Sequence, residues 1–309
     1  MSIEGQKPQK ESISEVLKKY KEMRNDDTLS NESKFSSNVI SDSIPKPKAF
    51  NQEEFERTMS RETDPDLMTS YEIVKLPSRG LFYPNGLSEV AVEYMTSKDE
   101  DMLTTPSLIE SGAILDILLK RKIKTADVNP ENLLVGDRNA IILFLRSSSY
   151  GSDYTVQVTD PRNGNPFKTV VNLTKLNYKE IKEAPDSNGH FIVELPMRKK
   201  VVLFKLLTSG EENILFKKAQ AIQEAYGEEF NQYSTMKLKA SIVSIGGNTD
   251  RNYIDKFVDA MPALDAYTIR KKILDVSPDV DMMYEFETKD HYTFKANLTV
   301  GVDFFFPNT

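Results

Sequence analysis

The side chains that could perform acid–base or metal chemistry are few and scattered. The chain has 309 residues and no cysteine, which excludes disulfides, thiolate nucleophiles and thiolate-bound zinc or iron–sulfur clusters. Its two histidines, His190 and His291, are far apart in the sequence, and each is predicted to lie in or beside a turn. A lone histidine in a turn is usually exposed, so histidine catalysis is not expected.

The acidic residues also form no convincing site. Asp279 and Asp281 could hold a divalent ion, but they follow a proline at a predicted helix-to-strand junction, where such residues usually cap a helix or face solvent. The adjacent pairs Glu211–Glu212 and Glu228–Glu229 would point about 100° apart on a helix and cannot converge on one bond. The sequence has no phosphate loop, HExxH, calcium loop or GxSxG motif. We therefore predict no catalytic residue, no metal and no cofactor, and keep an enzyme using Asp279 and Asp281 as an alternative.

Charge and composition narrow the possible partners. Forty basic and forty-seven acidic residues give a net charge of −7 and a pI of about 5.2, so no overall field attracts a polyanion. The basic clusters 198–200 and 270–272 have no neighbouring aromatic residues on which bases would stack. No apolar run of about eighteen residues and no basic-then-apolar leader is present. We expect a soluble protein made in the cytoplasm, with no nucleic-acid, membrane or small-molecule partner.

The N-terminal segment differs in composition from the rest. Apolar residues make up 39% of the chain, charged residues 28%, and the mean hydropathy is −0.46, which suggests that part of the length is unfolded. Residues 1–70 are predicted to be a flexible tail, while the length of the chain predicts about two folded units. Ser12 and Glu15 form a capping-box pattern at the start of one short amphipathic helix. This helix docks on a partner, packs on its own domain or is an ordinary part of the tail; its apolar residues are Ile13, Val16, Leu17 and Tyr20.

Residues 71–151 are predicted to form a lobe of strands and helices. Two strands flank a loop that contains Pro77, Gly80 and Pro84, and a helix is expected to enter at Thr105–Pro106. A second helix is expected to be capped by Asp137 and to end at Gly151 in the left-handed region.

The rest of the chain is predicted to alternate between strands and helices. A hairpin is expected within 152–196, with strands in 154–173 around an Asn-Gly turn, and an all-helical region within 197–278. Residues 279–309 are predicted to form two more strands, the last of which alternates apolar and polar residues over 292–306. Its terminal Phe-Phe-Phe-Pro cluster either returns to fill the core or contacts another subunit. The expected fold class is α+β.

Several motifs occur in a characteristic order over residues 71–309. The three longest are LPSRGLFYPNG, EVAVEYMTSKDEDMLTTPSLIESGAILDILL and LLVGDRNAIILFLRSSSYGSDY, and weaker ones are LTSGEEN, MPALDAYTIRKKI and VGVDFFFP. In these motifs the chain is similar to the baseplate hub assembly proteins of T-even-type contractile-tailed bacteriophages. This resemblance implies a non-enzymatic phage morphogenesis protein that acts in the cytoplasm of the infected bacterium and either leaves or stays in the virion baseplate.

The absence of two cysteine motifs that occur in many family members leads to a structural prediction. Many members carry two Cys-x-x-Cys knuckles, where this chain has residues 159–163 and 287–290 without cysteine. A structural zinc needs four ligands, so two knuckles that make one site must meet in space. We therefore expect the hairpins at 154–173 and 281–304 to pack into one metal-free lobe, with the helices of 198–276 inserted between them.

The predicted function is protein–protein contact in the baseplate hub. The protein is either a chaperone that leaves or a structural subunit that stays, and a generic peptide-binding adaptor is the alternative. The loop after Pro77 could instead fold onto its own core, and Gly136 to Arg138 could be an ordinary helix start with Arg138 paired to a carboxylate or carbonyl. The candidate partner-binding residues are Arg79, Gly80, Leu81, Phe82, Tyr83, Pro84, Gly136, Asp137, Arg138, Phe304, Phe305, Phe306 and Pro307.

Overall fold

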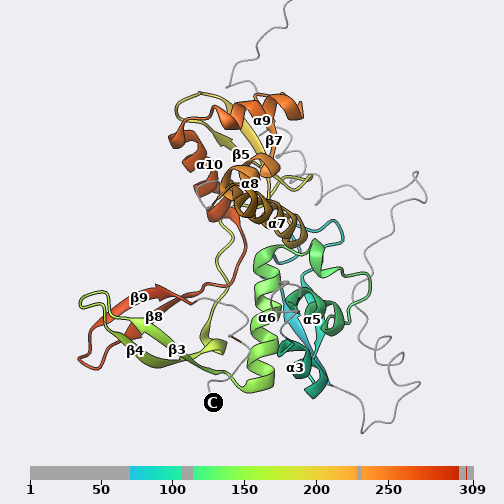
Figure 1. The fold of residues 1–309 in the computed structure, drawn as a ribbon. Coiled ribbons are helices and arrows are strands. Elements are labelled where there is room, and N and C mark those ends of the chain that lie inside the picture. The colour runs from blue at the N-terminus through green and yellow to red at the C-terminus, as the bar shows by residue number, and fades with distance from the viewer. Residues whose placement is uncertain (1–69, 106–113, 228–231, 299–303, 305–309) are drawn as a thin grey trace, which may run out of the picture. The chain divides into compact units, whose positions relative to one another are not determined.

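The computed structural model describes residues 70–105, 114–227, 232–298 and 304 (Figure 1). They divide into two units: an inserted unit of residues 182–207 and 212–276, and a main unit that holds the others. Each unit contains helices and antiparallel strands, which confirms the predicted α+β class. The predicted docking helix at 13–20 lies outside the described residues.

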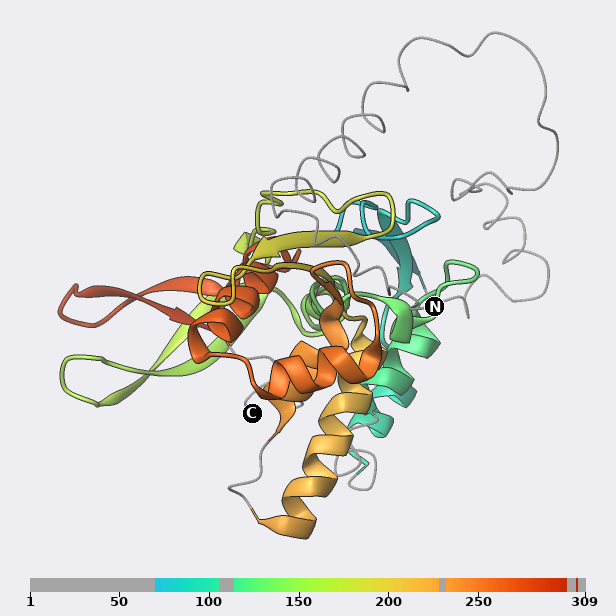
Figure 2. The ribbon, with the colours of Figure 1, turned by 90° about the horizontal axis from the view of Figure 1, so that it is seen from above.

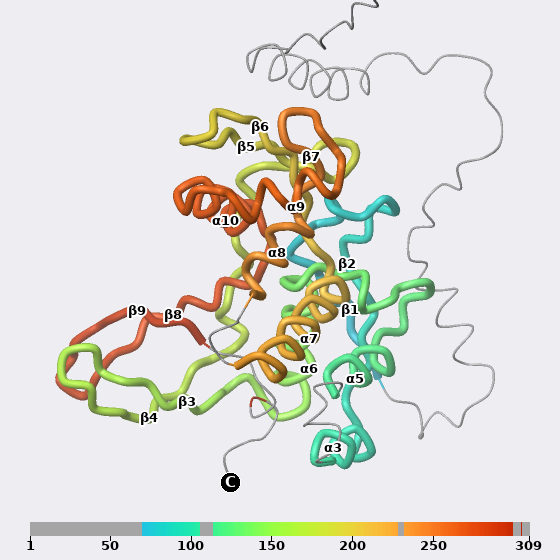
Figure 3. The backbone as a smooth tube through the Cα atoms, turned by 45° about the horizontal axis from the view of Figure 1, so that its top comes forward, coloured from blue at the N-terminus to red at the C-terminus, as the bar shows by residue number. Residues whose placement is uncertain are grey.

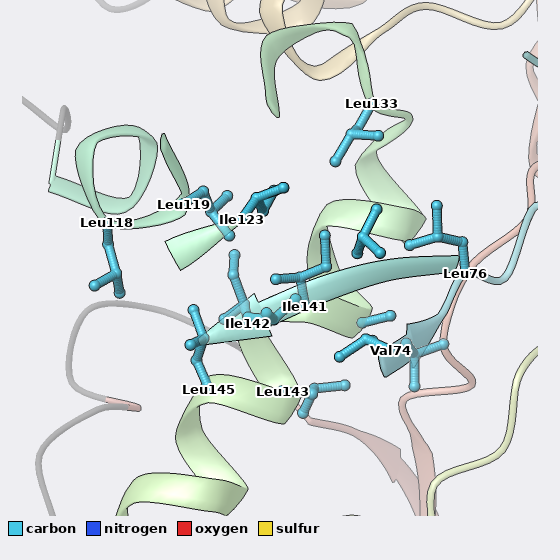
Figure 4. Close-up of a cluster of buried hydrophobic side chains, with 14 of the residues drawn as sticks. Val74, Leu76, Leu118, Leu119, Ile123, Leu133, Ile141, Ile142, Leu143 and Leu145 are labelled. Carbon is cyan, nitrogen blue, oxygen red and sulfur yellow. The ribbon is translucent and has the colours of Figure 1, made fainter. Parts of the chain in front are cut away.

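The main unit begins with a hairpin that packs against helices. Strand β1 (Tyr71–Lys75) pairs antiparallel with β2 (Glu89–Glu93), as predicted. The helices that follow are α3 (Ser97–Leu103), α5 (Ile114–Lys122) and α6 (Val135–Tyr150), with the short 3₁₀-helix η2 (Pro130–Asn132) before α6. Apolar side chains from these elements form one buried cluster (Figure 4), which includes Val74, Leu76, Leu118, Leu119, Ile141, Ile142 and Leu145.

The helix boundaries differ from the predictions at three places. Helix α3 was not expected, because it has only two apolar residues; a capping box stabilises its start, in which the Asp99 carboxylate accepts the Thr96 N–H at 2.8 Å. Helix α6 begins at Val135, so Asp137 lies in its first turn and is not its cap. Gly151 follows α6 with φ 84° and ψ 162°, which is not the left-handed helical conformation expected. The helix entry expected at Thr105–Pro106 adjoins residues 106–113, which lie outside the described part of the chain.

Two further hairpins of the main unit pack against each other and form what we name the hairpin lobe. Strands β3 (Asp153–Thr159) and β4 (Pro166–Asn172) make one hairpin, and β8 (Met283–Glu287) and β9 (Thr293–Asn297) make the other. The two hairpins lie side by side in Figures 1, 2 and 3. Their facing side chains form an apolar cluster around Val171, Phe286 and Leu298. At their tips, the Arg162 guanidinium binds the Asp290 carboxylate at 2.8 Å.

The last strand is shorter than its alternating pattern predicts. The alternation itself appears as burial, since Phe294, Ala296 and Leu298 are more buried than their neighbours. Strand β9 nevertheless ends at Asn297, although the Leu298 N–H still donates to the Met282 carbonyl at 2.9 Å, and residues 299–303 lie outside the described part. On the other hairpin, β4 is followed directly by the 3₁₀-helix η3 (Leu173–Lys175).

The inserted unit corrects the prediction of an all-helical region at 197–278. Its three-stranded antiparallel sheet consists of β5 (His190–Glu194), β6 (Val201–Lys205) and β7 (Ile242–Ile245). The boundary expected after residue 196 therefore falls inside the β5–β6 hairpin. The helical prediction failed because short apolar runs such as VVLFK and IVSI have no periodicity that separates a buried strand from a buried helix.

The helices of this region follow the predicted spacing more closely. They are α7 (Ser209–Tyr226), α8 (Tyr233–Ser241), α9 (Arg251–Asp259) and α10 (Ala263–Val276). The first residues of α7 belong to the main unit and the others to the inserted unit. Ile254, Val258 and Ile269 pack with buried residues of β6 and β7 in a second core.

Candidate protein contact site

The loop between β1 and β2, residues 76–88, carries six of the predicted contact residues, and we name it the contact loop. The N–H of Leu76 donates to the Ser88 carbonyl at 2.8 Å and closes its base. Arg79 and Gly80 both have positive φ, 54° and 77°. A Cβ on Gly80 would lie 2.5 Å from the Gly86 carbonyl oxygen, so this glycine allows both the turn and the close approach.

The buried carboxylate of Asp137 also holds the contact loop in place through hydrogen bonds. Asp137, in the first turn of α6, accepts the Ser78 N–H at 2.8 Å and the Tyr83 O–H at 2.5 Å. The Tyr83 oxygen in turn accepts the Leu134 N–H at 2.9 Å. Asp137 is therefore a positioning residue within the fold and not a surface group.

The electrostatics agree with this internal role. Burial raises the pKa of the Asp137 carboxyl, and its hydrogen bonds with Tyr83 and Ser78 offset only part of that rise. Burial, together with the nearby Asp137 carboxylate, also raises the pKa of the Tyr83 hydroxyl well above its usual range. Tyr83 therefore stays protonated and continues to donate at physiological pH.

The neighbours of Asp137 are also engaged within the chain. A Cβ on Gly136 would lie 2.0 Å from the Pro278 carbonyl oxygen, so the backbone of 278–279 packs directly on the start of α6. Gly136 thus permits a close approach that no larger residue would allow. Arg138 binds the Asp116 carboxylate of α5 at 2.7 Å. Of the two partners considered from the sequence, a carboxylate or a carbonyl, the structure therefore shows the carboxylate.

The C-terminal aromatic cluster is described at one position only. Phe304 is 2% exposed, and its ring meets Tyr154 edge-on at 4.8 Å between centroids. Its carbonyl accepts the Nε–H of Arg146 at 2.7 Å. Phe304 thus fills the core of the main unit and is not a free contact residue. Phe305, Phe306 and Pro307 lie outside the described residues.

The residues considered for chemistry have structural partners. Asp279 accepts the Asn139 side-chain N–H at 3.2 Å, and Asp281 accepts the Met283 N–H at 3.1 Å. His190 begins β5, and the exposed His291 lies beside Glu287 in the β8–β9 turn. Within the described ranges, no group of three or more acidic or histidine side chains is placed to hold a metal ion.

One basic cluster differs from its prediction. Arg198 lies over the Phe257 ring at 5.6 Å, and Lys200 lies near the rings of Phe257 and Tyr253 at 5.8 and 5.6 Å. Aromatic residues do accompany this cluster, because α9 brings them close from a distant part of the sequence. The chain's own cations already cover these rings.

Among the predicted contact residues that the structure describes, three are exposed, and all three lie in the contact loop. Arg79, Leu81 and Pro84 are exposed there, with half of the Leu81 surface accessible, whereas Phe82 and Tyr83 are partly buried. Sequence reasoning missed Ser78 and Asn139, which help to fix the loop and the 278–279 segment. Neither stands in a pattern that would have revealed its distant partner.

Comparison with known proteins supports the family resemblance indicated by the sequence motifs. The family model described as T4 bacteriophage base plate protein matches residues 68–305, which include the contact loop, α6 and both hairpins of the hairpin lobe. The chain belongs to this family. No curated protein and no solved structure matches it significantly. This baseplate protein has, among its described residues, no helix that is long and apolar enough to span a membrane.

Proposed function

We propose that this baseplate protein acts without catalysis in the assembly of the baseplate hub, by presenting the contact loop to another hub or tail protein. The observation that carries the proposal is the contact between the Asp137 carboxylate and the loop at Ser78 and Tyr83. Nucleic acid, membranes and small-molecule substrates are not among the proposed partners.

The physical reason is preorganisation. A loop that is ordered before binding loses little conformational entropy when a partner docks on it. Asp137 and Gly80 fix the backbone, so that Arg79, Leu81 and Pro84 are held in one arrangement. Leu81 offers apolar area, and Arg79 is a residue type that is enriched at protein interfaces.

The experiment compares two leucines of similar exposure. Leu81 is 50% exposed in the contact loop, and Leu264 is 52% exposed on α10. Phage carrying Leu81→Ser should lose much of the protein's association with baseplate intermediates, whereas Leu264→Ser should retain it. Normal association of the Leu81→Ser protein would refute the role of the loop.

The proposal includes two roles that differ in the fate of the protein. A chaperone works in the cytoplasm of the infected bacterium and leaves before maturation, whereas a subunit stays in the virion baseplate. Quantitative mass spectrometry of purified virions separates them: a subunit is present in a symmetric copy number, and a departing chaperone is nearly absent.

A further inference from the structure

The hairpin lobe contains a groove that its own strands leave open. The groove has a volume of about 420 Å³ and is lined by residues 167–170 of β4 and by residues 284–289 of β8 and its turn. These two strands belong to separate two-stranded sheets and exchange no backbone hydrogen bonds. Each therefore has one edge without a strand partner, and the two strands belong to neighbouring hairpins (Figure 3).

The register identifies which backbone groups lie on the edge of β4. Hydrogen bonds from Leu173 to Ser152 and from Asp160 to Asn165 continue the β3–β4 ladder at its two ends. Hydrogen-bonded and non-hydrogen-bonded pairs alternate in an antiparallel ladder. Lys168 and Val170 therefore belong to non-hydrogen-bonded pairs, and their N–H and C=O groups point away from β3.

The same reasoning applies to β8. The bonds from Thr288 to Tyr292 and from Leu298 to Met282 continue the β8–β9 ladder. Glu285 and Glu287 therefore direct their N–H and C=O groups away from β9. Met283 shares this orientation, but its N–H already donates to the Asp281 carboxylate at 3.1 Å.

The side chains around the groove define what would fit. Phe167, Tyr284 and Phe286 line it and belong to the apolar cluster of the lobe. Their strand neighbours Lys168 and Glu285 are exposed and form no salt bridge within the described part of the chain. A segment that alternates apolar and polar residues would place its apolar side chains against the rings and its polar ones beside the charges.

We propose that this groove accepts an extended segment of another baseplate protein as an added β-strand. The segment pairs with the open edges of β4 and β8, places alternate apolar side chains on the aromatic rings, and carries an acidic side chain beside Lys168 and a basic one beside Glu285. Strand addition to exposed sheet edges is a general mode of peptide recognition. This inference rests on the proposed function, because it requires a baseplate partner.

Proline substitutions test the edges without breaking the hairpins. Val170→Pro and Glu285→Pro each remove an outward N–H that the hairpin ladder does not use, and proline is tolerated at such edge positions. Matched controls are Thr155→Pro and Lys295→Pro, since these residues are the register partners on the opposite edges. Any loss of folding stability should be similar within each pair, as checked by thermal unfolding.

The assay uses the full chain and baseplate intermediates purified from cells infected with phage that lacks this protein. Cosedimentation should show at least about tenfold weaker binding for Val170→Pro and Glu285→Pro than for their controls. Hydrogen exchange of the bound wild type should slow at Lys168, Val170, Glu285 and Glu287 relative to the free protein.

The other outcomes overturn the inference in different ways. Cosedimentation without protection of these amides would overturn the strand-addition site and leave the proposed function standing. A protein that does not bind the intermediates at all would overturn both. Protection in the free protein that disappears on dilution would show that a second copy of the chain occupies the groove, which also contradicts the proposal.

Discussion

The Tyr83 hydroxyl donates to the Asp137 carboxylate at 2.5 Å, although 54 residues separate them in the sequence. This bond joins the contact loop to the first turn of α6. The Tyr83 hydroxyl oxygen also accepts a hydrogen bond from the Leu134 N–H, which gives the loop a second attachment. The conformation of the loop is therefore determined by the buried interior of the main unit and not by the loop alone.

Removal of this hydroxyl should destabilise the protein measurably. Tyr83→Phe leaves an Asp137 oxygen and the Leu134 N–H without a partner, so the free energy of unfolding should fall by about 1–3 kcal/mol. The control is Tyr94→Phe, whose hydroxyl donates to the exposed Glu72 at 3.1 Å and should matter little. Urea denaturation of both variants measures the difference, and equal effects would contradict the anchoring role.

The raised pKa of Asp137 predicts a pH-dependent stability. The folded state holds this proton more tightly than the unfolded chain, where an Asp pKa is about 3.9. The stabilising contribution is therefore complete below about pH 4 and is lost as the pH rises through the folded-state pKa. Relative to Asp137→Asn, which cannot ionise, the wild type should lose stability as the pH rises above about 4. Chemical denaturation across this range tests it, and a constant difference would be inconsistent with the shift.

The close packing at Gly136 predicts a strong effect of one methyl group. Gly136→Ala would place a Cβ 2.0 Å from the Pro278 carbonyl oxygen, and this clash should cost about 3 kcal/mol or more. Gly86→Ala is the control: it has positive φ but no atom within 4 Å of the added Cβ, so its cost should be about 1–2 kcal/mol. If thermal unfolding shows Gly136→Ala to be the milder change, the packing at 278–279 is not rigid.

The hairpin lobe should depend on its apolar cluster more than on its ion pair. Phe286 is buried, and Phe286→Ala should cost about 3–5 kcal/mol. Arg162 lowers the pKa of the Asp290 carboxyl, but both groups are exposed to solvent, which screens their attraction. Asp290→Asn should therefore shift the unfolding midpoint only slightly, and less at high salt. A large effect of Asp290→Asn in calorimetry would reverse this order.

Deletion of residues 1–65 tests the proposal that the docking helix binds a partner. Ile13, Val16, Leu17 and Tyr20 would then contribute to association and not to the folded core. The truncated protein should keep nearly the same melting temperature but bind baseplate intermediates more weakly. A large drop in melting temperature would instead show that the segment packs on its own domain.

The sequence by itself determined the elements whose signals are local. Alternation of residue types predicted the β1–β2 and β3–β4 hairpins. These features depend on a few consecutive residues, where side-chain period and turn chemistry dominate the energy. The motifs of the contact loop and of α6 were likewise sufficient to suggest the family.

Only the tertiary structure decided the roles that depend on distant partners. Asp137 has the residue type of a helix cap, but burial against Ser78 and Tyr83 makes it an anchor for the contact loop. The sequence alone allows Phe304 either to fill the core or to contact another subunit, and its contacts with Arg146 and Tyr154 show that it fills the core. The β5–β6–β7 sheet escaped prediction for the same reason. Pairing between strands far apart in the chain is a property of the folded backbone, and short buried runs carry no periodic signal of it.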